Sequence, residues 1–215
     1  YRAITWESKP DPASEKIIRQ AAAAQLTTDT NNPIDPNTLT DEDFVKITEL
    51  RIEYHELSDI KLLEKFTNLQ TLFLFNIRFP KKDIPSWMKM LSKLGIFNLS
   101  ERFNIDLSPL KKLSNLQTLN LLGTQVSNLE PLRNLTNLQT LNLYGTQVSN
   151  IEPLRSLSNL QTLYLLGTTQ VSNLEPLKGL KNLTHIYIMN CPNITNEQVE
   201  ELKKDGVYRI LPVNF

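Results

Sequence analysis

The sequence predicts an α/β fold built as a curved solenoid, with a parallel β-sheet on its concave face and short turns on its convex face. The first observation is a repeated unit: residues 115–136, 137–158 and 159–181 are near copies, and the first two agree at 18 of 22 positions. The second is a period-two alternation of leucines near the start of each copy, as in a strand with one buried face. Units repeated at such a fixed period stack on one another into a solenoid.

The first 45 residues lack this repeat and are expected to form an N-terminal extension and a helical cap. Residues 14–26 have the composition of a helix, and Thr40 suits the N-cap of a second helix that contains Phe44. Between them, residues 27–39 are rich in Thr, Asn, Asp and Pro and are predicted to be a loop. A cap is required because a terminal repeat would otherwise expose its apolar core to water.

The repeat frame extends to both sides of the three copies and covers residues 46–194. About seven repeats are predicted, and they begin at positions 46, 68, 93, 115, 137, 159 and 182. The third of them places Ile96, Asn98 and Ser100 on a strand of its own. In the second, apolar residues at helical spacing predict a short helix on the convex side, namely Ile84, Trp87, Met88 and Leu91.

The three near copies follow the leucine-rich-repeat spacing L-x-x-L-x-L-x-x-N/C-x-L, with threonine at the position of the usual asparagine. A Gly-Thr pair then turns the chain away from the sheet. The proline that follows is tolerated only in the first turn of a helix, so the convex side is predicted to be mostly 3₁₀ or short helical turns. In the copy that begins at position 115, the motif residues are Leu116, Leu119, Leu121, Thr124 and Val126.

Residues 195–215 are predicted to close the array with a helix and a final strand. Thr195 to Gln198 has the sequence of a capping box, and Gly206 suits the end of the helix. Residues 207–211 then alternate like a strand.

The chain is balanced in charge, with 23 Lys and Arg against 23 Asp and Glu. This balance argues against a nucleic-acid partner, because nucleic-acid-binding domains carry a basic surface. No apolar stretch reaches the roughly 18 residues of a membrane-spanning helix. We therefore expect neither nucleic-acid binding nor a transmembrane segment.

The sequence carries no pattern of an active site, so we expect a protein that is not an enzyme, without catalytic residues, metal or cofactor. Its only His and Cys residues are His55, His185 and Cys191, which are too few for an ordinary metal site. His55 and Cys191 fall on the repeat position of Thr124, where a packed structural role is expected. The glycine motifs that bind phosphate are absent.

The repeats resemble those of bacterial internalin-like leucine-rich-repeat proteins. The likeness rests on the 22-residue length, on Val126 two places after Thr124 and on Pro131-Leu132 on the convex side. The helical segment before residues 44–50 also resembles the cap of that family. The resemblance implies a secreted or surface-anchored bacterial protein that binds another protein on its concave sheet. A cytoplasmic location is the alternative.

The candidate binding residues follow from the alternation, because side chains between the inward leucines must point out onto the concave face. In the later strands they include Leu, Tyr and Met, which as exposed patches are typical of protein interfaces. The alternative is that they pack beside neighbouring strands or against a cap. The candidate ligand-binding residues are Phe73, Phe75, Leu122, Tyr144, Tyr164, Leu166, His185, Tyr187 and Met189.

The predicted function is therefore non-enzymatic recognition of a protein partner by a monomer. Two alternatives remain. One is a structural spacer or scaffold within a larger protein. The other is a carbohydrate-binding surface protein, suggested by the mixture of Tyr and Asn on the same face.

Overall fold

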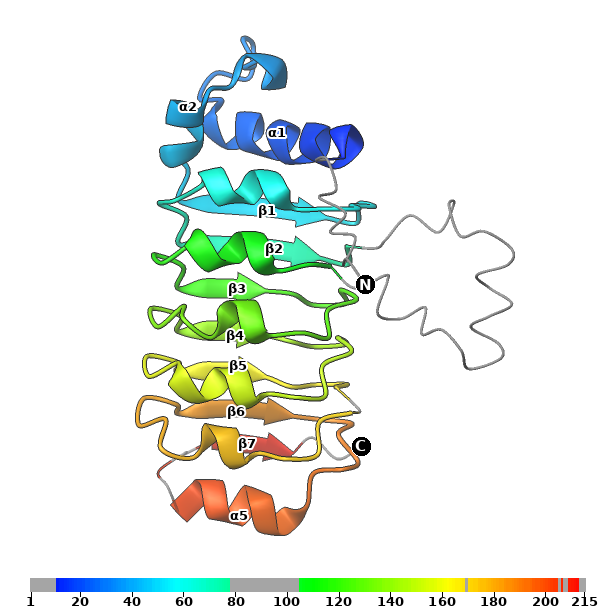
Figure 1. The fold of residues 1–215 in the computed structure, drawn as a ribbon, viewed down its shortest axis with the longest axis vertical. Coiled ribbons are helices and arrows are strands. Elements are labelled where there is room, and N and C mark those ends of the chain that lie inside the picture. The colour runs from blue at the N-terminus through cyan, green and yellow to red at the C-terminus, as the bar shows by residue number, and fades with distance from the viewer. Residues whose placement is uncertain (1–10, 78–104, 169, 205, 207–208, 213–215) are drawn as a thin grey trace, which may run out of the picture.

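The computed structural model describes residues 11–77, 105–168, 170–204, 206 and 209–212. Within them the chain forms one continuous stack of repeats, with helix α1 near one end and helix α5 at the other (Figure 1). Each repeat contributes a strand and a return segment, and the leucines of both fill the space between the two layers.

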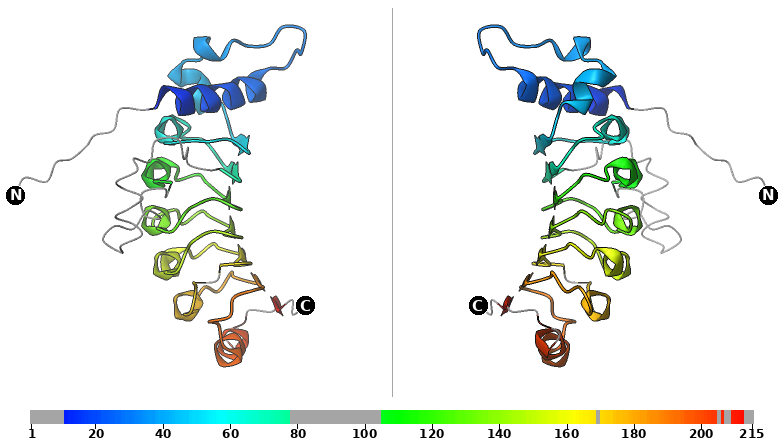
Figure 2. Two further views of the ribbon diagram at one scale, coloured as in Figure 1. Left: turned by 90° about the vertical axis from the view of Figure 1, so that its right-hand side faces the viewer. Right: turned by 90° about the vertical axis from the view of Figure 1, so that its left-hand side faces the viewer.

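A parallel sheet of seven strands forms one layer of the described residues, and its strands follow in chain order. The register sets inward leucines side by side, so that Leu119 lies between Leu72 and Leu141. The sheet lines the concave side of the stack, as the edge-on views show (Figure 2). The predicted parallel concave sheet is therefore confirmed. The strands are β1 (Glu49–Glu53), β2 (Thr71–Phe75), β3 (Thr118–Asn120), β4 (Thr140–Asn142), β5 (Thr162–Tyr164), β6 (His185–Ile188) and β7 (Arg209–Pro212).

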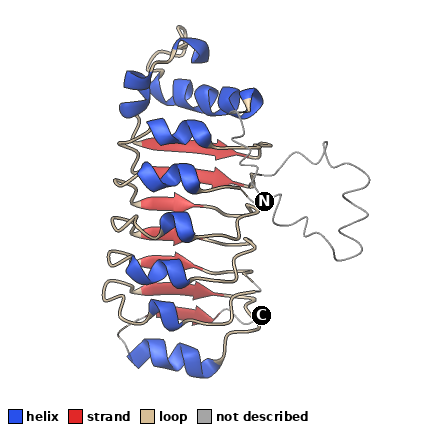
Figure 3. Ribbon diagram, in the orientation of Figure 1, coloured by secondary structure: helices blue, strands red, loops and turns tan. Residues whose placement is uncertain are grey.

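Short 3₁₀ helices form the convex layer, as predicted (Figure 3). Each of the 3₁₀ helices named below begins with an Asp or Asn side chain that accepts the backbone N–H of the residue two positions later in the chain. Asn128, for example, accepts the N–H of Glu130 at 2.9 Å. All but η2 carry proline in their first turn, where its missing N–H is not needed. The helices are η2 (Lys61–Lys65), η4 (Ser108–Lys112), η5 (Glu130–Leu132), η6 (Glu152–Ser156) and η7 (Glu175–Leu177).

The threonine of the repeat motif is buried and hydrogen-bonded, which explains why a polar residue is tolerated inside the stack. The Thr124 hydroxyl donates to the carbonyl of Leu121 at 2.6 Å, and the Thr146 hydroxyl does the same to Leu143 at 2.7 Å. Each threonine therefore closes its own turn.

Cys191 and His55 occupy the same repeat position but behave differently. Cys191 is buried, and its thiol donates to the carbonyl of Leu165 at 2.9 Å, in keeping with the packed role expected for it. His55 is exposed, so the packed role expected for His55 is wrong. Size is not the reason, because Ile77 occupies the same repeat position and is fully buried. A buried imidazole would need hydrogen-bond partners for its two ring nitrogens, whereas in solvent water supplies them.

The turn after each strand requires a residue in the left-handed region, and Gly123 and Gly145 supply it with φ of 69° and 67°. A Cβ at Gly123 would lie 2.0 Å from Oδ1 of Asn76, whereas one at Gly145 would meet nothing closer than 3.8 Å. We expect Gly145→Ala to lower the free energy of unfolding by about 1–2 kcal/mol through backbone strain. Gly123→Ala should cost more, because the Asn76 side chain must also move. Urea denaturation measures both, and equal losses would contradict this close approach.

Strand β2 pairs directly with β3, which contradicts the predicted third repeat. The register joins Thr71 to Thr118, and beyond the strand ends the Asn76 N–H donates to the carbonyl of Leu122 at 2.8 Å. A parallel sheet has no room for a further strand between two that are hydrogen-bonded to each other. The prediction that a strand containing Ile96, Asn98 and Ser100 lies between them is therefore wrong.

The convex layer shows how the repeat after β2 is completed. Asp106 begins η4 in the same way as Asp59 begins η2. Residues 68–77 and 105–114 therefore form one repeat, interrupted by residues 78–104. The predicted helix of Ile84, Trp87, Met88 and Leu91 lies in that interruption, outside the described residues.

The N-terminal cap is helical, as predicted, and consists of α1 (Pro12–Leu26), η1 (Pro36–Thr38) and α2 (Asp41–Val45). Helix α1 begins two residues before the predicted position because Asp11 caps it, accepting the Ser14 N–H at 2.9 Å. It lies against β1 and η2. Phe44 of α2 packs on Phe66 of the first repeat, with ring centroids 4.8 Å apart. The cap thus covers the apolar end of the stack.

An ionised carboxylate holds the start of α2. Asp43 accepts the backbone N–H of Thr40 at 3.0 Å and pairs with Lys46 at 2.8 Å. The hydrogen bond from Lys46, with those from Thr40, lowers the pKa of Asp43 from 3.8 to about 2. The stabilisation from these contacts is therefore complete at neutral pH and is lost only as the pH falls from about 3.8 through about 2.

At the other end, α5 (Asn196–Lys204) buries Leu202 against the last repeat, and β7 pairs with β6. The hydroxyl of Thr195 accepts the Gln198 N–H at 3.3 Å, as in the first half of a capping box. The division of the chain after residues 45 and 194 stays a prediction.

Candidate binding surface on the concave sheet

Outward side chains of neighbouring strands form columns along the concave face. In the middle column the register aligns Asn142 with Tyr164, and Tyr164 with Tyr187. The nine predicted ligand-binding residues all lie outside the core: Tyr144 is exposed, at 40%, and the other eight are half-buried. Their side chains are therefore partly open to a ligand.

Five of these residues gather on the later repeats, and we call them the C-terminal cluster: Tyr144, Tyr164, Leu166, Tyr187 and Met189. The rings of Tyr164 and Tyr187 are stacked, with centroids 4.5 Å apart and planes within 6°. The Tyr144 ring lies against the turn of the next repeat, where its Cε2 is 3.2 Å from the position of a Cβ on Gly167. The Leu166 and Met189 carbonyls accept the N–H groups of Gly145 and Gly167, which fixes both backbones.

Tyr164 replaces an asparagine that has a structural role in the earlier copies. Asn120 accepts the N–H of Leu122, and Asn142 accepts that of Tyr144, both at 2.9 Å. A tyrosine cannot form this local hydrogen bond and instead adds an aromatic surface. Burial, and to a lesser extent Tyr187, raises the pKa of Tyr164, so its phenol is neutral.

His185 and Leu122 flank the C-terminal cluster. His185 lies two residues before Tyr187 on the same face, and its Nδ1 is 2.9 Å from the Thr184 hydroxyl. Leu122 is half-buried on the repeat before Tyr144. Both positions agree with the predicted surface, although His185 adds polarity to its edge.

Phe73 and Phe75 belong to a separate group on the first two strands, which we call the N-terminal cluster: Arg51, Tyr54, Phe73 and Phe75. The guanidinium of Arg51 lies 3.9 Å from the centroid of Phe73, and Tyr54 meets Phe75 edge to face at 5.0 Å. Threonines and asparagines of β3 and β4 separate this group from the C-terminal cluster. The structure therefore places the candidate residues in two separate groups.

Tyr54 was missed from the sequence, although one signal was available. It stands at the repeat position of Gly123 and has a φ of 57°, an uncommon conformation for a residue other than glycine. A glycine position occupied by an aromatic residue is therefore the feature that could have identified it.

Among the outward residues of β1 to β5, the charged ones lie on β1. Arg51 pairs with Glu49 at 2.9 Å and approaches Glu53 at 3.8 Å. The outward residues of β2 to β5 are uncharged at neutral pH. The middle of the surface therefore carries no charge of its own.

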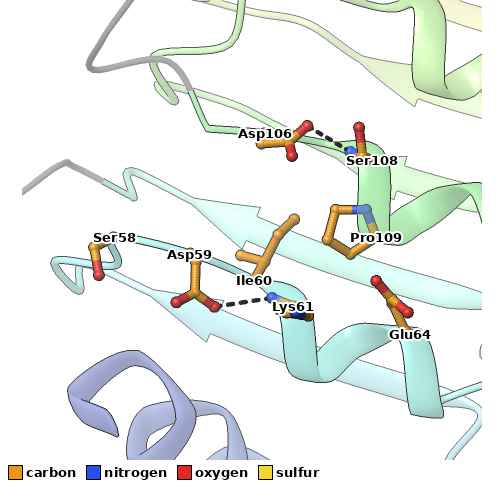
Figure 4. A pocket seen from close by; sticks show the side chains of 8 residues that line it. All are labelled: Ser58, Asp59, Ile60, Lys61, Glu64, Asp106, Ser108 and Pro109. Atoms are coloured by element: carbon orange, nitrogen blue, oxygen red, sulfur yellow. Dashed lines mark hydrogen bonds between the residues drawn. The ribbon is translucent and has the colours of Figure 1, made fainter. Parts of the chain in front are cut away.

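The convex side has a cavity of about 260 Å³ between η2 and η4, lined by Asp59, Glu64 and Asp106 among others (Figure 4). Asp59 and Asp106 accept the N–H groups that begin the two 3₁₀ helices, and Glu64 pairs with Lys112 at 2.5 Å. These carboxylates serve the fold. The described residues contain no group of three His, Cys, Asp or Glu placed to hold a metal ion.

The stack of repeats is shared with known proteins. An internalin from Listeria monocytogenes matches with a TM-score of 0.60 and 23% identity, over 86% of this chain and 47% of that one. Residues 136–179 match the family model described as leucine-rich repeats in two copies. The chain has the leucine-rich-repeat fold, and its structure is similar to that of an internalin. The predicted resemblance is thus confirmed, and this leucine-rich-repeat protein spans about half the length of that internalin.

Two further solved structures are similar to the leucine-rich-repeat protein. Internalin C2 from Listeria monocytogenes matches at 21% identity and a TM-score of 0.48, covering 94% of this chain and 93% of that one. A leucine-rich-repeat protein from Leptospira interrogans matches at 20% identity and a TM-score of 0.46, covering 81% of this chain and 51% of that one. A search of the curated proteins found no match. In the described ranges, no helix has the length and apolarity needed to cross a bilayer.

Proposed function

We propose that this protein is a non-enzymatic recognition module that binds a protein partner through the concave sheet. The leucine-rich-repeat fold commonly serves as a protein-interaction module, because its curvature creates an extended concave surface. The observation that carries the proposal is the C-terminal cluster, with its stacked and partly exposed Tyr164 and Tyr187. Tyrosine is enriched in protein interfaces since it offers a large contact area and a polar tip.

The setting of this module is part of the proposal. The resemblance to internalins favours a secreted or cell-surface protein of a bacterium, with an adhesin-like role. The polar middle of the sheet, with Asn120 and Asn142, is already engaged in local hydrogen bonds, which favours a protein over a carbohydrate ligand. A spacer function would leave the C-terminal cluster without a use.

The test is capture of a partner by the immobilised protein from host and bacterial extracts. The variant Tyr144→Ala/Tyr164→Ala/Tyr187→Ala should lose at least about 100-fold in affinity, since truncated interface hot spots cost 2 kcal/mol or more each. Its melting temperature should stay close to that of the wild type, because all three rings lie outside the core.

The matched control is Arg133→Ala/Arg155→Ala/Lys178→Ala, which removes three cations from the convex face. It should capture the partner as the wild type does. Equal capture by the tyrosine variant would refute binding on the concave sheet. A loss of folding would show that the three rings are packing residues.

A further inference from the structure

An open pocket of about 310 Å³ lies where β1 and β2 end, lined by Tyr54, His55, Glu56 and Asn76. Tyr54 is 70% exposed, and its ring stands edge to face on Phe75 at an interplanar angle of 77°. An aromatic side chain this exposed contributes little to the core. The pocket therefore presents an exposed aromatic ring, that of Tyr54, which the core does not need.

Among the described residues at this end of the stack, acidic groups outnumber basic groups. Glu49 and Glu53 share the single cation of Arg51, and Glu53 is the more distant, at 3.8 Å. Glu56 is exposed and forms no ion pair with a described residue. The remaining negative charge favours a positively charged group from outside the chain.

The chain itself shows how a guanidinium is accommodated in these surroundings. Arg51 lies over the face of Phe73 between two carboxylates, which is the arrangement of a cation–π contact with ion pairs. Phe75 is the next outward ring after Phe73 on β2, and the ring of Tyr54 lies against it. Glu53 of β1 is the register partner of Phe75. Within the described part of the chain, no cation lies over that second pair of rings.

We propose that the partner inserts an arginine or lysine side chain into this pocket, against Tyr54 and Phe75 and paired with Glu53 and Glu56. The inference rests on the proposed function, since it names the chemistry of the same partner. It also gives a spacing: the step from β1 and β2 to β5 and β6 is four strands, or about 19 Å. An extended partner segment would therefore carry its base about six residues from the apolar side chains that meet the C-terminal cluster.

The test is selection of peptides from a random 16-residue library displayed on phage. The baits are the wild type, Glu53→Gln/Glu56→Gln, the triple tyrosine variant and a convex control, Glu130→Gln/Glu152→Gln. The wild type and the convex control should enrich peptides that combine an apolar pair with an Arg or Lys about six residues away. Against Glu53→Gln/Glu56→Gln, the same peptides should bind about 10-fold more weakly, and the basic preference should fall to the library frequency.

The outcomes separate this inference from the proposed function. Apolar peptides without a basic preference, or a preference that survives in Glu53→Gln/Glu56→Gln, would overturn the basic pocket alone. Enrichment of the same peptides by the triple tyrosine variant would overturn the role of the C-terminal cluster. A wild-type bait that enriches no peptide would overturn both.

Discussion

Replacing Leu141 by alanine is expected to lower the free energy of unfolding by about 2–5 kcal/mol. Leu141 is fully buried in β4, between Leu119 and Leu163 in the register of the sheet. Truncation there leaves a cavity among side chains that stacked neighbours hold in place, so the loss exceeds the transfer free energy of the methyl groups alone. Chemical denaturation followed by circular dichroism measures it.

The matched control is Leu166→Ala, the same substitution on the opposite face. Leu166 is half-buried on the concave surface, so its truncation should cost about 1 kcal/mol or less. Equal losses for the two variants would contradict the assignment of inward and outward residues, on which the candidate surface depends.

The largest effect on binding is expected from the stacked tyrosine pair. Tyr164→Ala should weaken binding of the captured partner by about 30-fold or more, because a truncated hot spot costs at least 2 kcal/mol. Tyr164→Phe keeps the ring and the stack on Tyr187, so it should lose much less. Calorimetry or surface plasmon resonance with the purified partner measures both variants.

A double-mutant cycle with Tyr187→Ala tests whether the two rings act as one unit. Rings in direct contact are coupled by about 0.5–1.5 kcal/mol, so the double variant should lose less than the sum of the single losses. Strict additivity would mean that the partner contacts the two rings independently, and that the stack has no role in binding.

Much of the fold could be predicted because its signals are local and repeated. Leu119 and Leu141 occupy the same position in two near-identical copies, and a period of two forces their neighbours outward. The same argument places Tyr164 and Tyr187 on the concave face. Their stacking follows from parallel register and could not be read from one repeat alone.

The failures have physical causes. The apolar spacing of residues 93–114 matches the repeat frame, but spacing does not show that β2 and β3 are hydrogen-bonded to each other. Asp106, at the position that begins a convex turn, is the residue that shows where the repeat resumes. The frame position of His55 predicts packing, yet a buried imidazole would need partners for its polar ring nitrogens, and the side chain is exposed. The contact of Arg51 with Phe73 depends on side-chain rotamers, which the pattern of residues does not specify.

The central claim is that a protein partner covers the concave sheet, and hydroxyl-radical footprinting of the complex tests it most directly. Oxidation of Tyr144 and Met189 should slow several-fold when the purified partner is bound, while Val45, exposed on the N-terminal cap, should react at the rate of the free protein. Unchanged rates at Tyr144 and Met189 in a saturated complex, or protection confined to the convex turns, would contradict the account.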